Sequence, residues 1–217
     1  MFRRNGLWLV MGLCVVLLNG CQKKAAEEIS YGSFSDSVYR NDFFGLAITI
    51  PATWNVQSKA ALAKLSETGS KMVSGDDKTL QARLDAAKER SLNLFAAFEH
   101  PQGAPVDFNS SILSAAEVVS DQPGIKRGSD YLFHARKLFE TGQLKYDIAK
   151  GTQTETLGGV QFDVLQMTML GQPVTINQKY YVTIKNGYAL IFIVTFDSPE
   201  REQQLNEILK TVTFAKG

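Results

Sequence analysis

Histidine and cysteine are scarce in this chain, whose 217 residues contain two of each. His100 and His134 lie far apart in the sequence, whereas Cys14 and Cys21 both lie near its start. Two separated histidines without a nearby cysteine cannot form a closed zinc site on their own. We therefore expect no metal centre and no cofactor, and we interpret both histidines as surface or packing residues.

Recognisable catalytic motifs are missing as well. The chain has no G-x-S-x-G, no glycine-rich phosphate loop and no H-E-x-x-H. Ser110 and Ser111 could be combined with His134 into a hydrolase site, but nothing in the sequence places these residues side by side in space. The segment Asn109-Ser110-Ser111 is typical of a turn. We therefore expect that the protein is not an enzyme.

A large excess of charge of one sign is also absent. The chain has 23 basic and 22 acidic side chains, which gives a formal net charge of +1. Removal of the first 20 residues takes away Arg3 and Arg4 and leaves a net charge of about −1. A near-neutral domain argues against nucleic acid as the partner.

The chain opens with the outline of a secretory signal. A short cationic stretch precedes the uncharged run 7–18, which is shorter than the roughly 20 apolar residues that a spanning helix needs. The run ends in LNGC at 18–21, which resembles the bacterial lipobox, with Asn19 in the place of a smaller residue. The resemblance implies cleavage before Cys21 and transfer of lipid to its thiol.

Lipidation of Cys21 would determine how the protein meets a membrane. Several acyl chains on one residue hold a domain to a bilayer, because each buried CH₂ contributes about 0.8 kcal/mol. We therefore expect a lipoprotein that faces the periplasm and has the lipid bilayer as a partner. Gln22 is not the Asp that resembles an inner-membrane retention signal, which favours the outer membrane if the cell is Gram-negative. The alternative is an ordinary signal peptide that is cut near Ala25-Ala26.

Three regions follow from this interpretation. Residues 1–20 are the lipoprotein signal peptide, residues 21–37 are the lipidated cysteine with a flexible linker, and residues 38–217 are one globular domain. No thiol is left in the domain to form a disulfide. Its stability must therefore come from a hydrophobic core, which a mature chain of about 197 residues is long enough to bury.

The first half of the domain mixes strands with helices. Apolar segments predict strands at 44–50, 92–98 and 110–120. Apolar stripes at helical spacing predict helices at 59–73, 76–90 and 129–141. We interpret Gly75-Asp76-Asp77 as an acidic N-cap and not as a metal loop, because no further carboxylate or histidine lies at ligand spacing.

The second half predicts a meander of strands and a closing helix. Strands are expected at 144–149, 152–157, 160–170, 174–185 and 188–196, with a short strand at 211–214. Asn186-Gly187 predicts a tight hairpin, because both residues must tolerate positive φ. The segment YALIFIVTF is apolar at both parities, so we expect it to be covered on both faces. Ser198-Pro199 predicts the start of the last helix.

Antiparallel strands with helices on both faces predict an α+β fold, a three-layer α/β/α sandwich around a mainly antiparallel sheet. The segments FFGLAITIPATWNV, TLGGVQFDVLQMTMLGQPVTINQKYYVTIKNGYALIFIVTF and SPEREQQLNEILKTVTF carry this pattern. Together they resemble the PsbP-like family, in its DcrB-like bacterial lipoprotein branch, over roughly residues 39–216. The resemblance implies a non-enzymatic accessory or interaction role, since relatives assist a membrane protein complex or bind a small GTPase. It carries no site residue over to this chain.

Three function classes remain open at this point. The favoured one is an interaction or accessory module for a membrane or envelope complex, with an envelope protein as partner. The alternatives are a carrier or sensor of a small apolar ligand bound between sheet and helices, and an enzyme. A ligand groove could be lined by Trp54, Phe43, Phe44, Tyr180 and Tyr181, although we interpret these aromatic residues as core.

One face of the expected strand 174–185 is a candidate partner surface. Lys179, Tyr181, Thr183 and Lys185 alternate along the strand and therefore share a face, which is more polar than the opposite one. We expect this face to be a docking surface for the partner.

The lipobox generates the first prediction. Cys21→Ser should leave the precursor without lipid, because the thiol that receives the diacylglycerol is gone. The variant should be found either with an uncleaved signal peptide or as soluble protein, which detergent partitioning and mass spectrometry of the N-terminus can distinguish. An acyl mass on the mature N-terminus of the variant would show that the lipobox interpretation is wrong.

Overall fold

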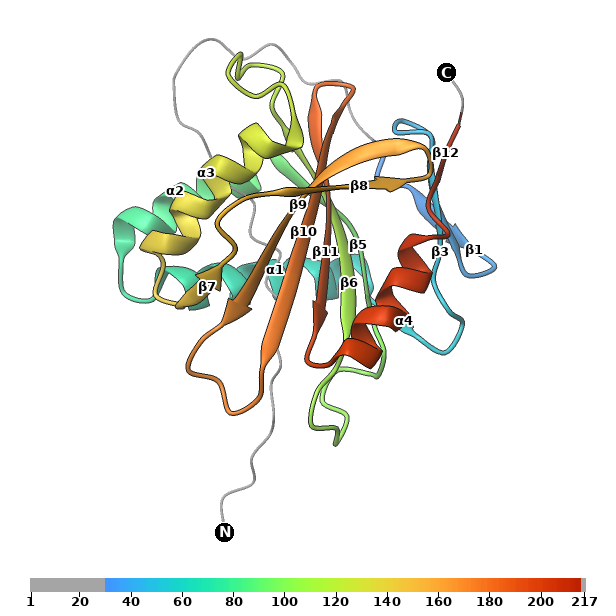
Figure 1. Cartoon of the computed structure of the whole chain (residues 1–217), viewed down its shortest axis with the longest axis horizontal. Coiled ribbons are helices and arrows are strands. Elements are labelled where there is room, and N and C mark those ends of the chain that lie inside the picture. The colour runs from blue at the N-terminus through green and yellow to red at the C-terminus, as the bar shows by residue number, and fades with distance from the viewer. Residues whose placement is uncertain (1–29, 216–217) are drawn as a thin grey trace.

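Eight antiparallel strands form the central sheet. Seven of them follow the order β4-β5-β6-β11-β10-β9-β7. The eighth, β8, pairs with the first half of β9, whereas β7 pairs with its last residues. The computed structural model describes residues 30–215 (Figure 1). The strands are β4 (Asn55–Val56), β5 (Ser91–Phe98), β6 (Ser111–Val118), β7 (Tyr146–Ile148), β8 (Gln153–Leu157), β9 (Val160–Met169), β10 (Ile176–Lys185) and β11 (Tyr188–Phe196). The expected meander of the second half is confirmed.

The hairpin of β10 and β11 lies at the centre of this sheet. Asn186 and Gly187 have φ values of 52° and 80°, which is the conformation that a tight hairpin of this kind requires. The turn places Lys185 opposite Tyr188, and the pairing continues to Asn177 and Phe196. Every residue of β11 is buried, so this strand is covered on both faces, as its apolar sequence predicted.

A second, four-stranded sheet has the order β1-β2-β3-β12. Its strands are β1 (Ser33–Ser35), β2 (Val38–Asn41), β3 (Leu46–Thr49) and β12 (Thr213–Phe214). The linker predicted for residues 21–37 therefore ends earlier than expected. Phe34 packs its ring against Phe95 and Tyr39, at centroid distances of 5.8 and 5.3 Å, and this contact fixes β1 on the domain.

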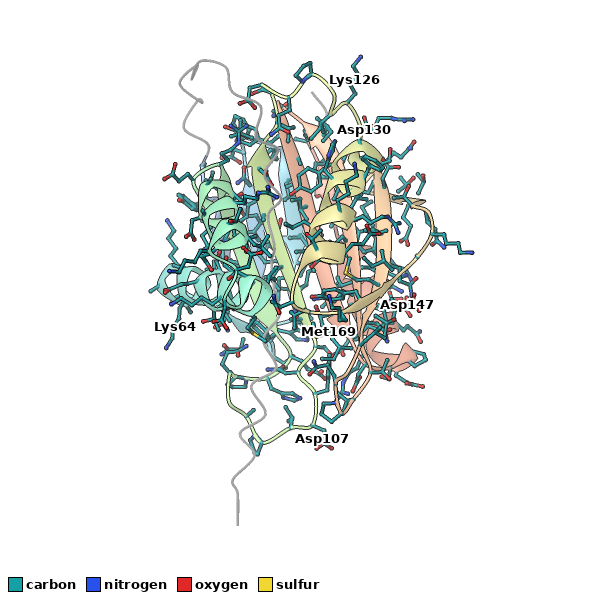
Figure 2. All side chains as sticks on the ribbon, turned by 90° about the vertical axis from the view of Figure 1, so that its left-hand side faces the viewer. Lys64, Asp107, Lys126, Asp130, Asp147 and Met169 are labelled. Atoms are coloured by element: carbon teal, nitrogen blue, oxygen red, sulfur yellow. The ribbon has the colours of Figure 1, made fainter. Side chains whose placement is uncertain are left out.

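Three helices cover one face of the central sheet and one helix lies on the other face (Figures 1 and 2). The first three are α1 (Lys59–Ser74), α2 (Lys78–Lys88) and α3 (Gly128–Thr141), and the fourth is α4 (Pro199–Leu209). Ser58, Asp77 and Ser198 act as N-caps, since each side chain accepts a hydrogen bond from a backbone N–H of the first turn. Asp77 is thus the cap that the sequence predicted.

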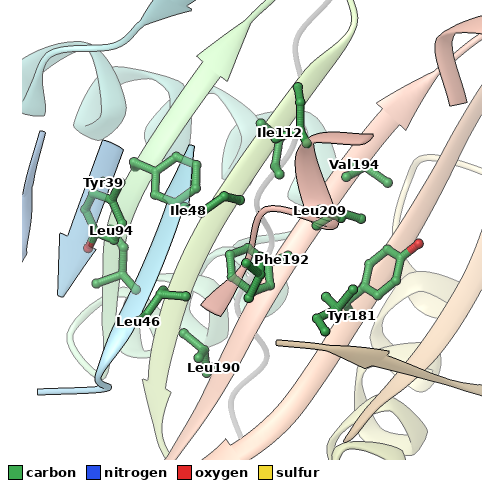
Figure 3. Close-up of a cluster of buried hydrophobic side chains, with 14 of the residues drawn as sticks. Tyr39, Leu46, Ile48, Leu94, Ile112, Tyr181, Leu190, Phe192, Val194 and Leu209 are labelled. Carbon is green, nitrogen blue, oxygen red and sulfur yellow. The ribbon is translucent and has the colours of Figure 1, made fainter. Parts of the chain in front are cut away.

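Two hydrophobic cores lie on the two faces of the central sheet. The helix-side core is formed by the sheet with α1, α2 and α3, and includes Leu132 and Ile193. The α4-side core is formed by the sheet with α4 and the four-stranded sheet, and includes Ile48, Phe192 and Leu209 (Figure 3). The expected α+β sandwich is confirmed, but its third layer is one helix together with a small sheet.

The position of β11 generates the second prediction. Phe192→Ala should lower the free energy of unfolding by about 3 to 5 kcal/mol, because the ring is fully buried and its removal leaves a cavity. The control is Phe133→Ala, at a side chain of α3 that is 54% exposed, which should change stability by no more than about 0.5 kcal/mol. Urea denaturation measures both, and equal midpoints for the two variants would contradict a central β11.

Candidate functional site

The polar face of β10 is not the open docking surface that the sequence predicted. Tyr181 is 0% exposed and Thr183 9% exposed, and the Lys179 side chain retains 12% of its accessible surface. The reason is that this face contributes to the α4-side core and is covered there. Lys185 is half-buried, with its Nζ 5.4 Å from the centroid of the Phe214 ring. The prediction of a partner surface at these four residues is therefore wrong.

Lys179 belongs instead to a small ionic cluster. Its Nζ lies 2.7 Å from Glu202 Oε1 on α4 and 3.9 Å from Glu155 Oε1 on β8. Burial raises the pKa of the Tyr181 hydroxyl, and the nearby carboxylates of Glu155 and Glu202 raise it further. We call these four residues the Lys179 cluster, and they join β10 to β8 and α4.

Arg201, the neighbour of Glu202 on α4, forms a second cluster. Its Nη1 donates to both carboxylate oxygens of Asp197, at 2.8 and 2.7 Å, and its Nε lies 3.5 Å from Glu99 Oε2. The guanidinium also lies over the ring of Phe108, 5.6 Å from the centroid. The hydrogen bonds to Asp197 raise the pKa of Arg201. We call these four residues the Arg201 cluster.

The two clusters hold the first turn of α4 from both sides. Lys179 and Arg201 each meet two carboxylates, so both cations are used in contacts within the domain. A guanidinium does not lose its proton at physiological pH, and it therefore cannot act as a general acid or base. The arrangement suits the positioning of α4 on the sheet.

The two histidines lie in different surroundings. His134 on α3 is half-buried beside Phe133, and its pKa is lowered by burial and by the charge of Lys137. His100 follows β5, and its backbone N–H and C=O both bond the side chain of Asn109, each at 2.9 Å. Its Nε2 lies 4.0 Å from Glu99 Oε1. His100 thus borders the Arg201 cluster, a contact that its position in the sequence did not indicate.

Ser110 and Ser111 are both fully buried. Within residues 30–215 neither hydroxyl has a hydrogen-bond partner, so no serine–histidine pair is formed there. The same part of the chain contains no group of three His, Cys, Asp or Glu side chains that could hold a metal ion.

A buried carboxylate that the sequence analysis did not single out lies in β6. Glu117 is fully buried, and its Oε2 accepts a 2.7 Å hydrogen bond from the hydroxyl of Tyr131 on α3. Close by, Arg90 donates to the carbonyl oxygen of Val118 at 3.0 Å and pairs with Asp121, whose pKa this pairing lowers. These contacts join β6 to α3 and to the end of α2. In the sequence, the signal for this buried carboxylate was an acidic residue near the end of a mostly apolar strand.

The aromatic residues that might have lined a ligand groove pack in the two cores. Phe44 and Trp54 lie in the α4-side core with Tyr181, and Phe43 packs against it. Tyr180 lies in the helix-side core. The interpretation of these residues as core is therefore confirmed. Cys21, the proposed lipidation site, lies outside the described residues.

Comparison of the sequence with known protein families and with curated proteins finds no match. Solved structures with a similar fold include PA94 and LpqN. PA94 of Pseudomonas aeruginosa, a protein of unknown function, is 14% identical with a TM-score of 0.42, over 58% of this chain and 83% of its own. LpqN of Mycobacterium tuberculosis, which is involved in cell envelope biogenesis, is 14% identical with a TM-score of 0.41, over 79% of this chain and 83% of its own. Similarity at this level carries no argument about function.

The Lys179 cluster generates the third prediction. Lys179→Met should lower the free energy of unfolding by about 2 kcal/mol, because it leaves two partly buried carboxylates without their shared cation. The control is Lys210→Met at the C-cap of α4, whose pair with Glu207 at 2.6 Å is largely exposed, and it should cost at most about 1 kcal/mol. Urea denaturation at neutral pH compares the two, and an equal loss would argue against the clamping role of Lys179.

Proposed function

We propose that this chain is a lipid-anchored, non-enzymatic envelope protein that acts as an interaction or accessory module for a membrane or envelope complex. The observation that carries the proposal is the short interval between the lipidation motif at 18–21 and the first strand of the domain. About 12 residues separate Cys21 from Ser33, which at full extension span no more than about 43 Å. The domain therefore works close to the bilayer that holds its anchor.

The ionic contacts of the domain support a non-enzymatic role. Lys179 and Arg201 are committed to carboxylates that fix α4, and Glu117 is bonded to Tyr131 between sheet and helix. These side chains are therefore engaged in contacts between elements of the domain. The resemblance to the PsbP-like family supports the same role, and Gln22 favours the outer membrane of a Gram-negative cell. Residues 30–215 contain no helix with the length and hydrophobicity needed to cross a bilayer.

The fourth prediction tests this function by complementation of a deletion strain. A soluble form with an ordinary signal peptide and Cys21→Ser should fail to restore the phenotype, because the domain is no longer held at the membrane. The same domain behind the signal peptide and lipobox of an unrelated lipoprotein should restore it. His100→Ala combined with His134→Ala should behave as the wild type, since neither side chain has a chemical role.

Circular dichroism and immunoblotting must show that each form is folded and present at equal level. Full activity of the soluble form would contradict the positional part of the proposal. Loss of activity in the folded double-histidine variant would contradict the non-enzymatic part and would point to the surroundings of one of the two histidines.

A further inference from the structure

An exposed aromatic residue stands where the chain leaves the folded domain toward Cys21. Tyr31 is 46% exposed, and Lys59 at the start of α1 places its Nζ 4.6 Å from the centroid of the Tyr31 ring. The backbone oxygen of Tyr31 accepts a 2.7 Å hydrogen bond from the hydroxyl of Tyr39, which is itself buried. Tyr31 is therefore held in place by the domain although its ring faces solvent.

Further apolar and cationic side chains belong to the same region. Val56, which is 39% exposed, precedes Lys59 along the chain, separated from it by Gln57 and Ser58. Arg40 is exposed on β2 and is paired across the sheet with Ser33 of β1. We call Tyr31, Arg40, Val56 and Lys59 the exit surface.

The balance of charge at the exit surface is positive. The charged residues of the stretch 30–64 are Asp36, Arg40, Asp42, Lys59 and Lys64, which gives three cations and two acids. Figure 2 shows Lys64 at the outer edge of α1. A surface that combines aromatic and apolar groups with excess cations suits the headgroup layer of an anionic membrane, where tyrosine rings are enriched and lysine and arginine are attracted.

The length of the tether limits how far the exit surface can lie from the membrane. Cys21 and Tyr31 are about ten residues apart, so that even a fully extended chain reaches no more than about 36 Å. A domain of this size has a diameter of roughly 40 Å. The exit surface is the part of the domain to which the tether is joined, and it therefore stays within the length of the tether from the bilayer.

We propose that the exit surface rests on the anionic headgroups of the bilayer that holds lipidated Cys21, so that the domain has a fixed orientation on the membrane. This inference rests on the lipid anchoring proposed above. Tyr31 and Val56 enter the headgroup layer, and Lys59 and Arg40 contact lipid phosphates. The helix α3, on the opposite side of the molecule from β1, then faces away from the bilayer and is free for a protein partner (Figure 1).

The domain offers a matched control surface on α3. Phe133 is 54% exposed, and Lys137 places its Nζ 4.3 Å from the centroid of the Phe133 ring. This pair repeats the chemistry of Tyr31 and Lys59, but it is far from the exit of the chain. If one of the two surfaces contacts the membrane more than the other, the cause is therefore the orientation of the domain and not the types of side chain at that surface.

The fifth prediction compares fluorescent probes at the two surfaces. Lipidated full-length protein carrying either Val56→Cys or Phe133→Cys is labelled with a nitrobenzoxadiazole fluorophore and reconstituted into vesicles of phosphatidylethanolamine and phosphatidylglycerol. Headgroup spin-labelled lipids should quench the probe at position 56 roughly threefold more than the probe at position 133. Arg40→Glu combined with Lys59→Glu should bring the quenching at position 56 down to the level at 133, whereas Lys137→Glu should leave it unchanged.

The outcomes separate this inference from the proposed function. Equal quenching at the two positions in protein that floats with the vesicles, or stronger quenching at 133, would overturn the orientation and leave the lipid anchor intact. Protein that does not float with the vesicles and has no acyl mass would overturn the anchor and, with it, this inference. If Val56→Cys does not fold, Tyr31→Cys provides the same comparison with Phe133→Cys.

Discussion

Burial of β11 on both faces is the constraint on which the rest of the structure depends. Alternate residues of this strand enter the two cores, Phe192 on the α4 side and Ile193 on the helix side. Each face must be covered, so three helices pack on one side while α4 and the four-stranded sheet pack on the other. Polar groups near the covered faces need partners within the domain, because burial of an unpaired charge is costly. Lys179 accordingly meets two carboxylates, and Glu117 meets a tyrosine.

The sequence predicted those elements whose signals are local. Asn186-Gly187 specified the central hairpin, and Ser198 specified the start of α4, because turn and cap chemistry depends on a few neighbouring residues. The strands β1 and β2 were missed, since they are short and are joined at Asp36 and Ser37, which adopt positive φ without a glycine to signal it. Tertiary contacts, and not local pattern, hold these strands in place.

The prediction of a partner surface on β10 was wrong for a related reason. Alternation along β10 correctly placed Lys179 and Tyr181 on one face, but periodicity says nothing about what covers that face. Glu155 and Glu202, which complete the Lys179 cluster, come from elements far apart in the sequence. The exit surface was equally hidden, because Tyr31 and Lys59 are 28 positions apart in the sequence and meet only in the folded domain. In both cases a surface is defined by the contacts between elements.

The four-stranded sheet draws its strands from both ends of the domain. β12 pairs with β3, and Thr211, just before β12, bonds Thr49 across 162 positions of sequence. A chain that emerges N-terminus first therefore leaves the side of β3 that meets α4 uncovered until residues 199–214 have followed. The α4-side core closes only when α4 and β12 have packed. A chain that is truncated before these elements therefore keeps hydrophobic surface exposed to chaperones and proteases.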